Sequence, residues 1–250
     1  MIKAQTIPEV ISNLDNIIDW SIQHNSRIGY FASLYRHMTI AVKSQIDKKG
    51  FADGLRMEQL DINFANRYLQ AWEAYTAQKK CSNAWCASFD ACDNNNLVVL
   101  QHLILGINTH INLDLGIAAA QTCPGDKIYD LQADFERINN IIASLSTQVQ
   151  EKLANVWFPL RFLKKISNKH EEAVLNFSIN TARKASWANA VALALIEGEA
   201  HDNYINSMDN TVVALAKRIM KPGLFALLLL KPVSWMESKD VSKIIRILND

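Results

Sequence analysis

Apolar residues recur at intervals of three and four along most of this 250-residue chain, which is the spacing of helices that bury one face. No segment alternates between apolar and polar residues for long, so strands are not expected. Only 8 glycines and 5 prolines are present, too few for the many tight turns of an all-β fold. With neither an internal repeat nor a linker, the sequence predicts one all-α domain over residues 1–250, a bundle of about eight helices around a buried central helix.

The predicted helices cover residues 6–24, 27–47, 55–78, 97–120, 126–156, 171–197, 203–220 and 238–248, with room for a short one at 84–89.

The central stretch, residues 97–120, is mostly apolar and carries no charge before Asp114. Five polar residues are set into it: His102, Asn108, His110, Asn112 and Asp114. Burying such groups without partners costs about 1–3 kcal/mol each. Neighbouring helices or a ligand must therefore satisfy them, and this stretch is the predicted place of a functional site.

The spacing of these residues limits their chemistry. On a helix, His102 and His110 lie about 12 Å apart along the axis, too far for both to bind one metal ion. His110 and Asp114 lie about 6 Å apart and can share one ion or one proton. Gly106 stands between the two histidines. A glycine in mid-helix costs about 1 kcal/mol relative to alanine, so it indicates that another part of the chain approaches closely.

The predicted helix at 55–78 carries carboxylates beside its apolar seam. Glu58 and Asp61 are three residues apart and therefore neighbours on the helix surface. They form either a solvated face with local ion pairs or, where this helix packs on the central one, further ligands for a metal at His110 and Asp114.

Arg183 lies on a predicted helix that is rich in small and apolar residues. Trp187 follows four residues later, so the two side chains can stack. Arg183 is either the partner of a buried carboxylate or substrate anion, or an arginine that extends its charge into solvent.

Charge and composition narrow the classes of partner. The 26 basic and 25 acidic residues give a net charge of +1, and no basic run with interleaved aromatics occurs, so no nucleic-acid partner is expected. The first residues lack the apolar core of a signal peptide, which predicts a cytoplasmic protein. The cysteines match no zinc spacing and are expected to be free thiols; they are Cys81, Cys86, Cys92 and Cys123.

The most apolar short segment covers residues 224–235. Its uninterrupted apolar run is far shorter than the roughly 20 residues that span a bilayer, so it predicts no transmembrane segment. We expect buried core there, or else a patch for peripheral membrane contact or a protein partner. The oligomeric state is left open.

Common catalytic motifs are absent. The sequence has neither a glycine-rich phosphate loop nor a dinucleotide fingerprint. It also lacks H-E-x-x-H, the Glu-x-x-His of ferritin-like di-iron proteins and the G-x-S-x-G elbow.

Five stretches carry a resemblance to a known family: RIGYFASLYRHMT (27–39), FADGLRMEQLDINFANRYLQAW (51–72), LQHLILGINTHINLDLGIAAA (100–120), DFERIN (134–139) and FSINTARKASW (177–187). On them the chain resembles, over nearly its whole length, an uncharacterised and mostly bacterial family of single-domain proteins of unknown function. Its most specific string is His-Leu-x-x-Gly-x-Asn-x-His-Ile-Asn-x-Asp-Leu. The resemblance implies an all-helical cytoplasmic domain and supplies no chemistry. The motif positions in this sequence are Arg56, Glu58, Asp61, Asn66, Arg67, His102, Asn108, His110, Asn112, Asp114 and Arg183.

Two functions fit these observations. The first is an enzyme for a small, partly apolar substrate, working by acid/base chemistry or with a divalent metal (Fe, Mn or Zn), which histidine and carboxylate ligands suit. The second is a non-catalytic helical module that binds a protein, lipid or apolar ligand, with the polar residues as a structural network. The predicted catalytic residues are His102, His110, Asp114 and Arg183, the substrate-binding residues are Asn108, Asn112, Arg56, Asn66 and Arg67, and the metal ligands are His110, Asp114, Glu58 and Asp61.

Overall fold

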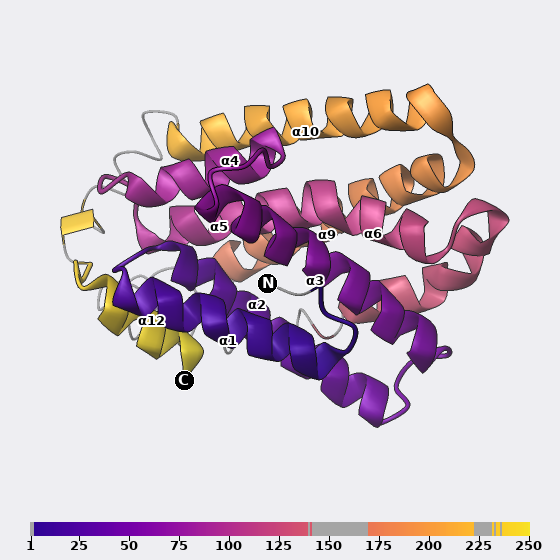
Figure 1. Cartoon of the computed structure of the whole chain (residues 1–250), viewed down its shortest axis with the longest axis horizontal. Helices are drawn as coiled ribbons and strands as arrows, with labels where there is room; N and C mark the ends of the chain where they lie inside the picture. Colours follow the sequence, from indigo (N-terminus) through magenta and orange to yellow (C-terminus); the bar gives the residue numbers. More distant parts are fainter. Residues whose placement is uncertain (1–2, 140, 142–169, 223–231, 233, 236) are drawn as a thin grey trace.

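The predicted all-α fold is confirmed: the described part of the chain contains the nine α-helices named below, a further helical stretch at residues 128–139 and no strand (Figure 1). The computed structural model describes residues 3–139, 141, 170–222, 232, 234–235 and 237–250. The helices are α1 (Ile7–Gln23), α2 (Ile28–Asp47), α3 (Gly54–Thr76), α4 (Asn83–Asp90), α5 (Val99–Thr109), α6 (Leu115–Thr122), α9 (His170–Leu195), α10 (Gly198–Met220) and α12 (Val241–Asn249).

Two predicted segments fall partly outside the described residues. Of the helix expected at 126–156, residues 128–139 are helical and 142–156 are not described. Of the apolar segment at 224–235, only residues 232, 234 and 235 are described. The expected membrane or partner patch there therefore stays a prediction.

Polar side chains fix the starts of the two helices that bring partners to the central helix. The Asp53 carboxylate accepts a hydrogen bond from the backbone N–H of Arg56 (3.0 Å) at the start of α3. The Ser82 hydroxyl accepts one from the backbone N–H of Trp85 (3.2 Å) at the start of α4. Such caps satisfy backbone donors that the first helical turn leaves open, and they set the axial positions of both helices.

The predicted central helix runs from Val99 to Thr122. It consists of α5, a π-helical turn at His110–Asp114 and α6. Figure 1 shows α5 and α6 in the middle of the molecule, with α10 along one edge and α1 and α12 along the opposite edge. The helix is long and apolar enough to cross a membrane, but 78% of its most apolar window is buried by other helices. A core helix has the same properties, so this observation gives only weak support for a membrane span.

The close approach expected at Gly106 is present. A Cβ atom added there would overlap the ring and Cβ of Phe31 on α2. Phe31 is buried (8% exposed) and packed among other rings, so it has little room to shift. The absence of a side chain at Gly106 therefore allows α2 and α5 to pack closely, at a point of α5 between the two histidines.

The cysteines correct one expectation. Cys81 and Cys86 form a disulfide, with Cα atoms 6.3 Å apart, and in the described part of the chain Cys92 and Cys123 are free. The start of α4 brings Cys86 back toward the preceding loop, which the five-residue spacing alone did not show. The cysteine pattern therefore no longer argues for a reducing compartment.

Candidate functional site

The site is centred on the buried carboxylate of Asp114, in the π-helical turn of the central helix. Its Oδ1 accepts a hydrogen bond from Arg67 Nε on α3 (2.8 Å). Its Oδ2 accepts one from Trp85 Nε1 on α4 (2.8 Å), and His110 Nδ1 lies 3.0 Å from the same oxygen. Asp114 is 1% exposed, so three groups from three elements replace the water that an ionised carboxylate loses on burial.

Opposing effects set the charges of this pair. Burial raises the pKa of Asp114, but the Arg67 charge and the hydrogen bonds from His110 and Trp85 outweigh it, and the net pKa is lowered. Burial also lowers the pKa of His110, which exceeds the raising effect of Asp114. The arrangement is therefore a neutral imidazole beside an ionised carboxylate. Since a carboxylate only accepts, His110 carries its proton on Nδ1, and Nε2 holds a lone pair.

Aromatic rings enclose the imidazole of His110, which is 2% exposed. The Phe64 ring stacks on it, with centroids 3.6 Å apart and planes 10° apart. Tyr35 meets it edge-on at 4.5 Å, and Phe31 does so at 5.7 Å. Apolar surroundings of this kind keep the local dielectric low and strengthen the bond to Asp114.

Several buried polar atoms around this enclosure have no hydrogen-bond partner: His110 Nε2, Tyr68 Oη and Asp61 Oδ2. Asp61 lies on α3 one turn before Phe64, and burial, with the nearby Glu58 charge, raises its pKa to about 7. The charges of Asp61 and Asp114 both raise the pKa of Tyr35, after burial itself, so both carboxylates lie near that phenol. Buried polar atoms without partners are uncommon and point to a ligand, an ion or water.

The structure thus brings four predicted site residues together and leaves others apart. His110 and Arg67 each contact Asp114 directly, and Asp61 is near enough for its charge to act on Tyr35. Arg67 binds Asp114 in this structure; its predicted contact with a substrate stays untested. Glu58 is half-buried one turn from Asp61 and acts on it through its charge.

The predicted amide residues contact other parts of the bundle. Asn108 donates to the backbone carbonyl of Val212 on α10 (3.1 Å) and accepts from Asn112 (3.0 Å). Asn66 makes two bonds of 2.9 Å with the backbone of Ala4. These hydrogen bonds satisfy the side-chain amides within the protein, so no ligand is needed to explain why they are buried.

The two other predicted cations also lie outside the Asp114 contacts. Arg56 donates to Asp53 (2.8 Å) and to the carbonyl of Asp130 (2.6 Å). Arg183 is 3% exposed and donates to Asn139 Oδ1 and to the carbonyl of Phe135, both at 2.5 Å.

The expected stacking of Arg183 is corrected by the geometry. Its guanidinium lies over the ring of Phe135, 4.5 Å from the centroid. Trp187 packs on that same ring, with centroids 5.0 Å apart. Arg183 and Trp187 therefore both contact Phe135, on the helix at 128–139, instead of stacking on each other. Burial lowers the pKa of Arg183 to about 10, which leaves it charged near neutral pH.

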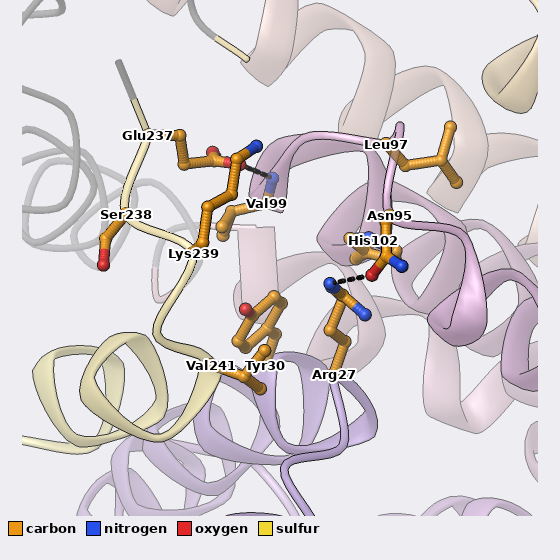
Figure 2. A pocket seen from close by; sticks show the side chains of 10 residues that line it. All are labelled: Arg27, Tyr30, Asn95, Leu97, Val99, His102, Glu237, Ser238, Lys239 and Val241. Atoms are coloured by element: carbon orange, nitrogen blue, oxygen red, sulfur yellow. Dashed lines mark hydrogen bonds between the residues drawn. The ribbon is translucent and has the colours of Figure 1, made fainter. Parts of the chain in front are cut away.

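His102 lies in a different environment from His110. It lines a small pocket with Arg27, Asn95 and Glu237 (Figure 2), and its ring meets Tyr30 edge-on at 5.9 Å. The two histidines share one stripe of the central helix, but their partners come from different segments.

The contacts of His110 and Asp114 in this structure do not fit the expectation that both side chains bind one metal ion. Both Asp114 oxygens already accept N–H donors, one of them from a guanidinium. Across the described residues no group of three or more His, Cys, Asp or Glu side chains is arranged to hold a metal ion. A metal at this site would bind His110 through Nε2, while Asp114 would hold the ring in its orientation by the hydrogen bond to Nδ1.

The comparisons agree with the resemblance seen in the sequence. Residues 7–222 match a family of unknown function (DUF5995). The chain belongs to this family. No curated protein and no solved structure matches it.

Residues that sequence reasoning missed complete the site of this family member. Trp85 lies on the short helix α4 and binds Asp114, and nothing in its local pattern distinguished it from a core tryptophan. Tyr35, Phe64 and Tyr68 occupy apolar-face positions of α2 and α3, where the sequence gives no sign that they differ from ordinary core residues. Their enclosure of His110 depends on how α2 and α3 cross the central helix.

Proposed function

We propose that this protein is a small-molecule enzyme in which His110 acts as general acid and base and Asp114 orients it. The observation that carries the proposal is the unpartnered Nε2 of a buried neutral imidazole whose other nitrogen contacts a fixed carboxylate. A histidine so held has the correct tautomer to take a proton at Nε2 and to return it.

The surroundings support this reading. Arg67 and Trp85 hold Asp114 in place, so the imidazole keeps one orientation. Single π-helical turns inside α-helices are frequent at functional sites, because the extra residue redirects the side chains around it. Here that turn is the one that begins at His110 and ends at Asp114.

The enclosing rings define the class of substrate. Phe64, Tyr35 and Phe31 offer apolar faces, and the unpartnered Asp61 and Tyr68 supply polar atoms nearby. They suit a small, uncharged and partly apolar molecule that carries a proton to be moved. Since His110 is 2% exposed, the rings must move apart for such a molecule to enter.

A non-catalytic helical module is the second candidate, and the complete enclosure of the Asp114 network favours it. Every oxygen of Asp114 has a donor, as in polar networks that fix helix register. In that case the His110 ring stays closed, and the function lies elsewhere on the protein.

Accessibility of His110 Nε2 distinguishes the two candidates. Diethyl pyrocarbonate acylates an unprotonated imidazole nitrogen, and peptide mass spectrometry locates the product. Each rate is divided by the rate of the same residue with the same reagent in the urea-unfolded protein. We expect His110 at pH 7 to be more protected than exposed His24 but less protected than the thiol of Cys123 (4% exposed) is toward a small uncharged maleimide. Protection of His110 equal to or greater than that of Cys123 would reject the enzyme and favour the closed network.

A matched variant tests the chemistry itself. His110→Asn keeps an N–H for Asp114 and removes the distal nitrogen. Any turnover found in a panel of small uncharged substrates should disappear in His110→Asn while the melting temperature changes little. Turnover that survives in this variant contradicts the assigned role of His110.

Metal content separates acid/base chemistry from a metal at the same nitrogen. The protein, its His110→Asn variant and an Asp114→Ala variant are each incubated with iron, manganese and zinc, and bound metal is measured by mass spectrometry. Stoichiometric metal that is lost in His110→Asn places an ion on Nε2 and replaces the acid/base role. Equal background metal in all three proteins leaves His110 as the proton-transfer group.

A further inference from the structure

A second candidate site lies at the start of the central helix, away from the His110 enclosure. Its pocket is shallow: it has a cavity volume of about 10 Å³, room for about one water molecule, and opens to solvent, so a larger ligand enters by displacing the Glu237 carboxylate. Figure 2 shows Arg27, Asn95 and His102 together on one side, with Tyr30, Glu237 and Lys239 across from them. These residues come from the start of α2, the loop before α5, α5 itself and the segment before α12.

His102 is the first sign that this pocket takes a ligand. The side chain is 5% exposed, and neither ring nitrogen makes a hydrogen bond. Burial lowers its pKa to about 4, with the Arg27 charge adding to the effect and the Leu97 carbonyl opposing it. The ring is therefore neutral near pH 7. The Leu97 carbonyl is close enough to act on it but does not form a hydrogen bond of ordinary geometry, and both ring nitrogens are buried, so the ring must turn to donate to a ligand in the pocket.

The second sign is that the pocket already binds a carboxylate. Both oxygens of Glu237 lie at the backbone N–H of Val99, at 3.0 and 3.1 Å. This N–H belongs to the first turn of α5, where open donors and the helix dipole favour an anion. Glu237, 138 residues away in the sequence, therefore occupies the position at this N–H that a bound anion would take.

Two cationic side chains line the same pocket. Arg27 donates to the carbonyl of Cys92 (2.9 Å) and to Asn95 Oδ1 (2.6 Å), which fixes the guanidinium while leaving further N–H groups available. Lys239 is exposed and donates to the carbonyl of Ser234 (2.9 Å). The charged side chains that line the pocket, Arg27, Lys239 and Glu237, sum to one positive charge, and the charge of nearby Asp240, which acts on Tyr30, offsets it; a carboxylate that replaces Glu237 at the Val99 N–H keeps this balance.

We propose that this pocket binds the carboxylate of a small molecule, which accepts from His102 and Arg27 and competes with Glu237 for the first turn of α5. The ligand class is a small monocarboxylate, since the chain's own Glu237 carboxylate shows which group fits. This site is separate from the His110 enclosure and does not depend on the enzyme proposed there.

The test follows the imidazole signals of His102 by NMR while sodium acetate is added to the full-length protein at pH 7. Sodium chloride at equal ionic strength is the control for screening. We expect saturable shifts of His102 with acetate and none with chloride, while the imidazole signals of His110 stay unchanged. Shifts of equal size with chloride, or none with acetate, overturn the proposal.

Two charge variants sharpen the result. Glu237→Gln removes the competing charge and should tighten acetate binding about fivefold, and Lys239→Met should weaken it about fivefold. Lys184→Met, on an exposed position of α9, is the matched control and should leave the affinity unchanged. Weaker binding in Glu237→Gln, or equal effects of the two lysine variants, contradicts the assigned contacts.

Discussion

The two buried histidines of the central helix differ in what surrounds them. His110 has a fixed carboxylate on one nitrogen and a free lone pair on the other. His102, eight residues earlier on the same stripe, has cations and a pocket beside it, and neither nitrogen is bonded. Burial lowers the pKa of both rings.

The comparison shows that position on a helix face does not decide what a buried histidine can do. Asp114 fixes the tautomer of His110, so the ring can move a proton. His102 lacks such an anchor and can donate to an anion that enters the pocket. The following predictions change one side of this comparison at a time, from the largest expected effect to the smallest.

Removing the anchor should have the largest effect. Asp114→Ala leaves the Trp85 N–H buried without an acceptor and takes the partner from Arg67. Removing one partner of a buried charged pair costs about 3–5 kcal/mol, and we expect that loss in the free energy of unfolding measured with urea. Asp47→Ala, which breaks the exposed pair with Lys43, should cost less than about 1 kcal/mol. Similar losses in both variants would mean that the Asp114 network is not a distinct stabilising unit.

The next largest effect is on the pH dependence of the free energy of unfolding, and it comes from His102. The folded-state pKa of about 4 lies below the ordinary value of about 6.5, so the unfolded chain takes up this proton first as pH falls. Stability is therefore lost as pH falls from about 6.5 to 4, by at most about 3 kcal/mol from this group. His102→Phe should lose less stability than the wild type over that range. The measurement is urea unfolding at several pH values, and His201→Gln, at a partly exposed position, is the control. Parallel curves for His102→Phe and wild type would contradict the buried neutral state.

Much of the fold could be predicted from periodicity, because each helix buries one face. The central helix, the close contact at Gly106 and the pairing of His110 with Asp114 all depend on spacing within one helix. The rest depends on how helices cross. Arg67 and Trp85 reach Asp114 from α3 and α4, and Arg183 meets Phe135 across 48 residues. Spacing along the chain carries no information about such contacts.

A smaller loss of stability is expected when Trp85, which donates a hydrogen bond to Asp114, is replaced, and Trp72, which makes no such bond, provides the comparison. Trp85→Phe removes the N–H that Asp114 Oδ2 accepts, and a hydrogen bond to a charged group contributes about 1.5–3 kcal/mol. Trp72→Phe is a matched control, because its buried Nε1 has no partner to lose. We expect Trp85→Phe to cost about 2 kcal/mol more in urea unfolding than Trp72→Phe. Equal costs would show that ring volume, and not the bond to Asp114, determines the effect.

The smallest predicted effect lies between the two histidines, at Gly106. Alanine there gains about 1 kcal/mol in helix propensity but overlaps Phe31, including its Cβ, which cannot rotate away. Overpacking of a core costs about 1–3 kcal/mol, so we expect a net loss of about 1 kcal/mol.

Two further variants show whether Phe31 is the cause of that loss. Gly54→Ala meets only an ordinary contact at 3.7 Å and should not destabilise. Phe31 also lies edge-on to the His110 ring, so Gly106→Ala should shift the NMR signals of His110, and a Phe31→Ala background, which removes the Cγ and Cδ2 atoms that lie closest, should reduce both effects. A loss at Gly106 that persists unchanged in that background would locate the strain elsewhere on α2. The coupling between Phe31 and His110 would then not pass through this contact.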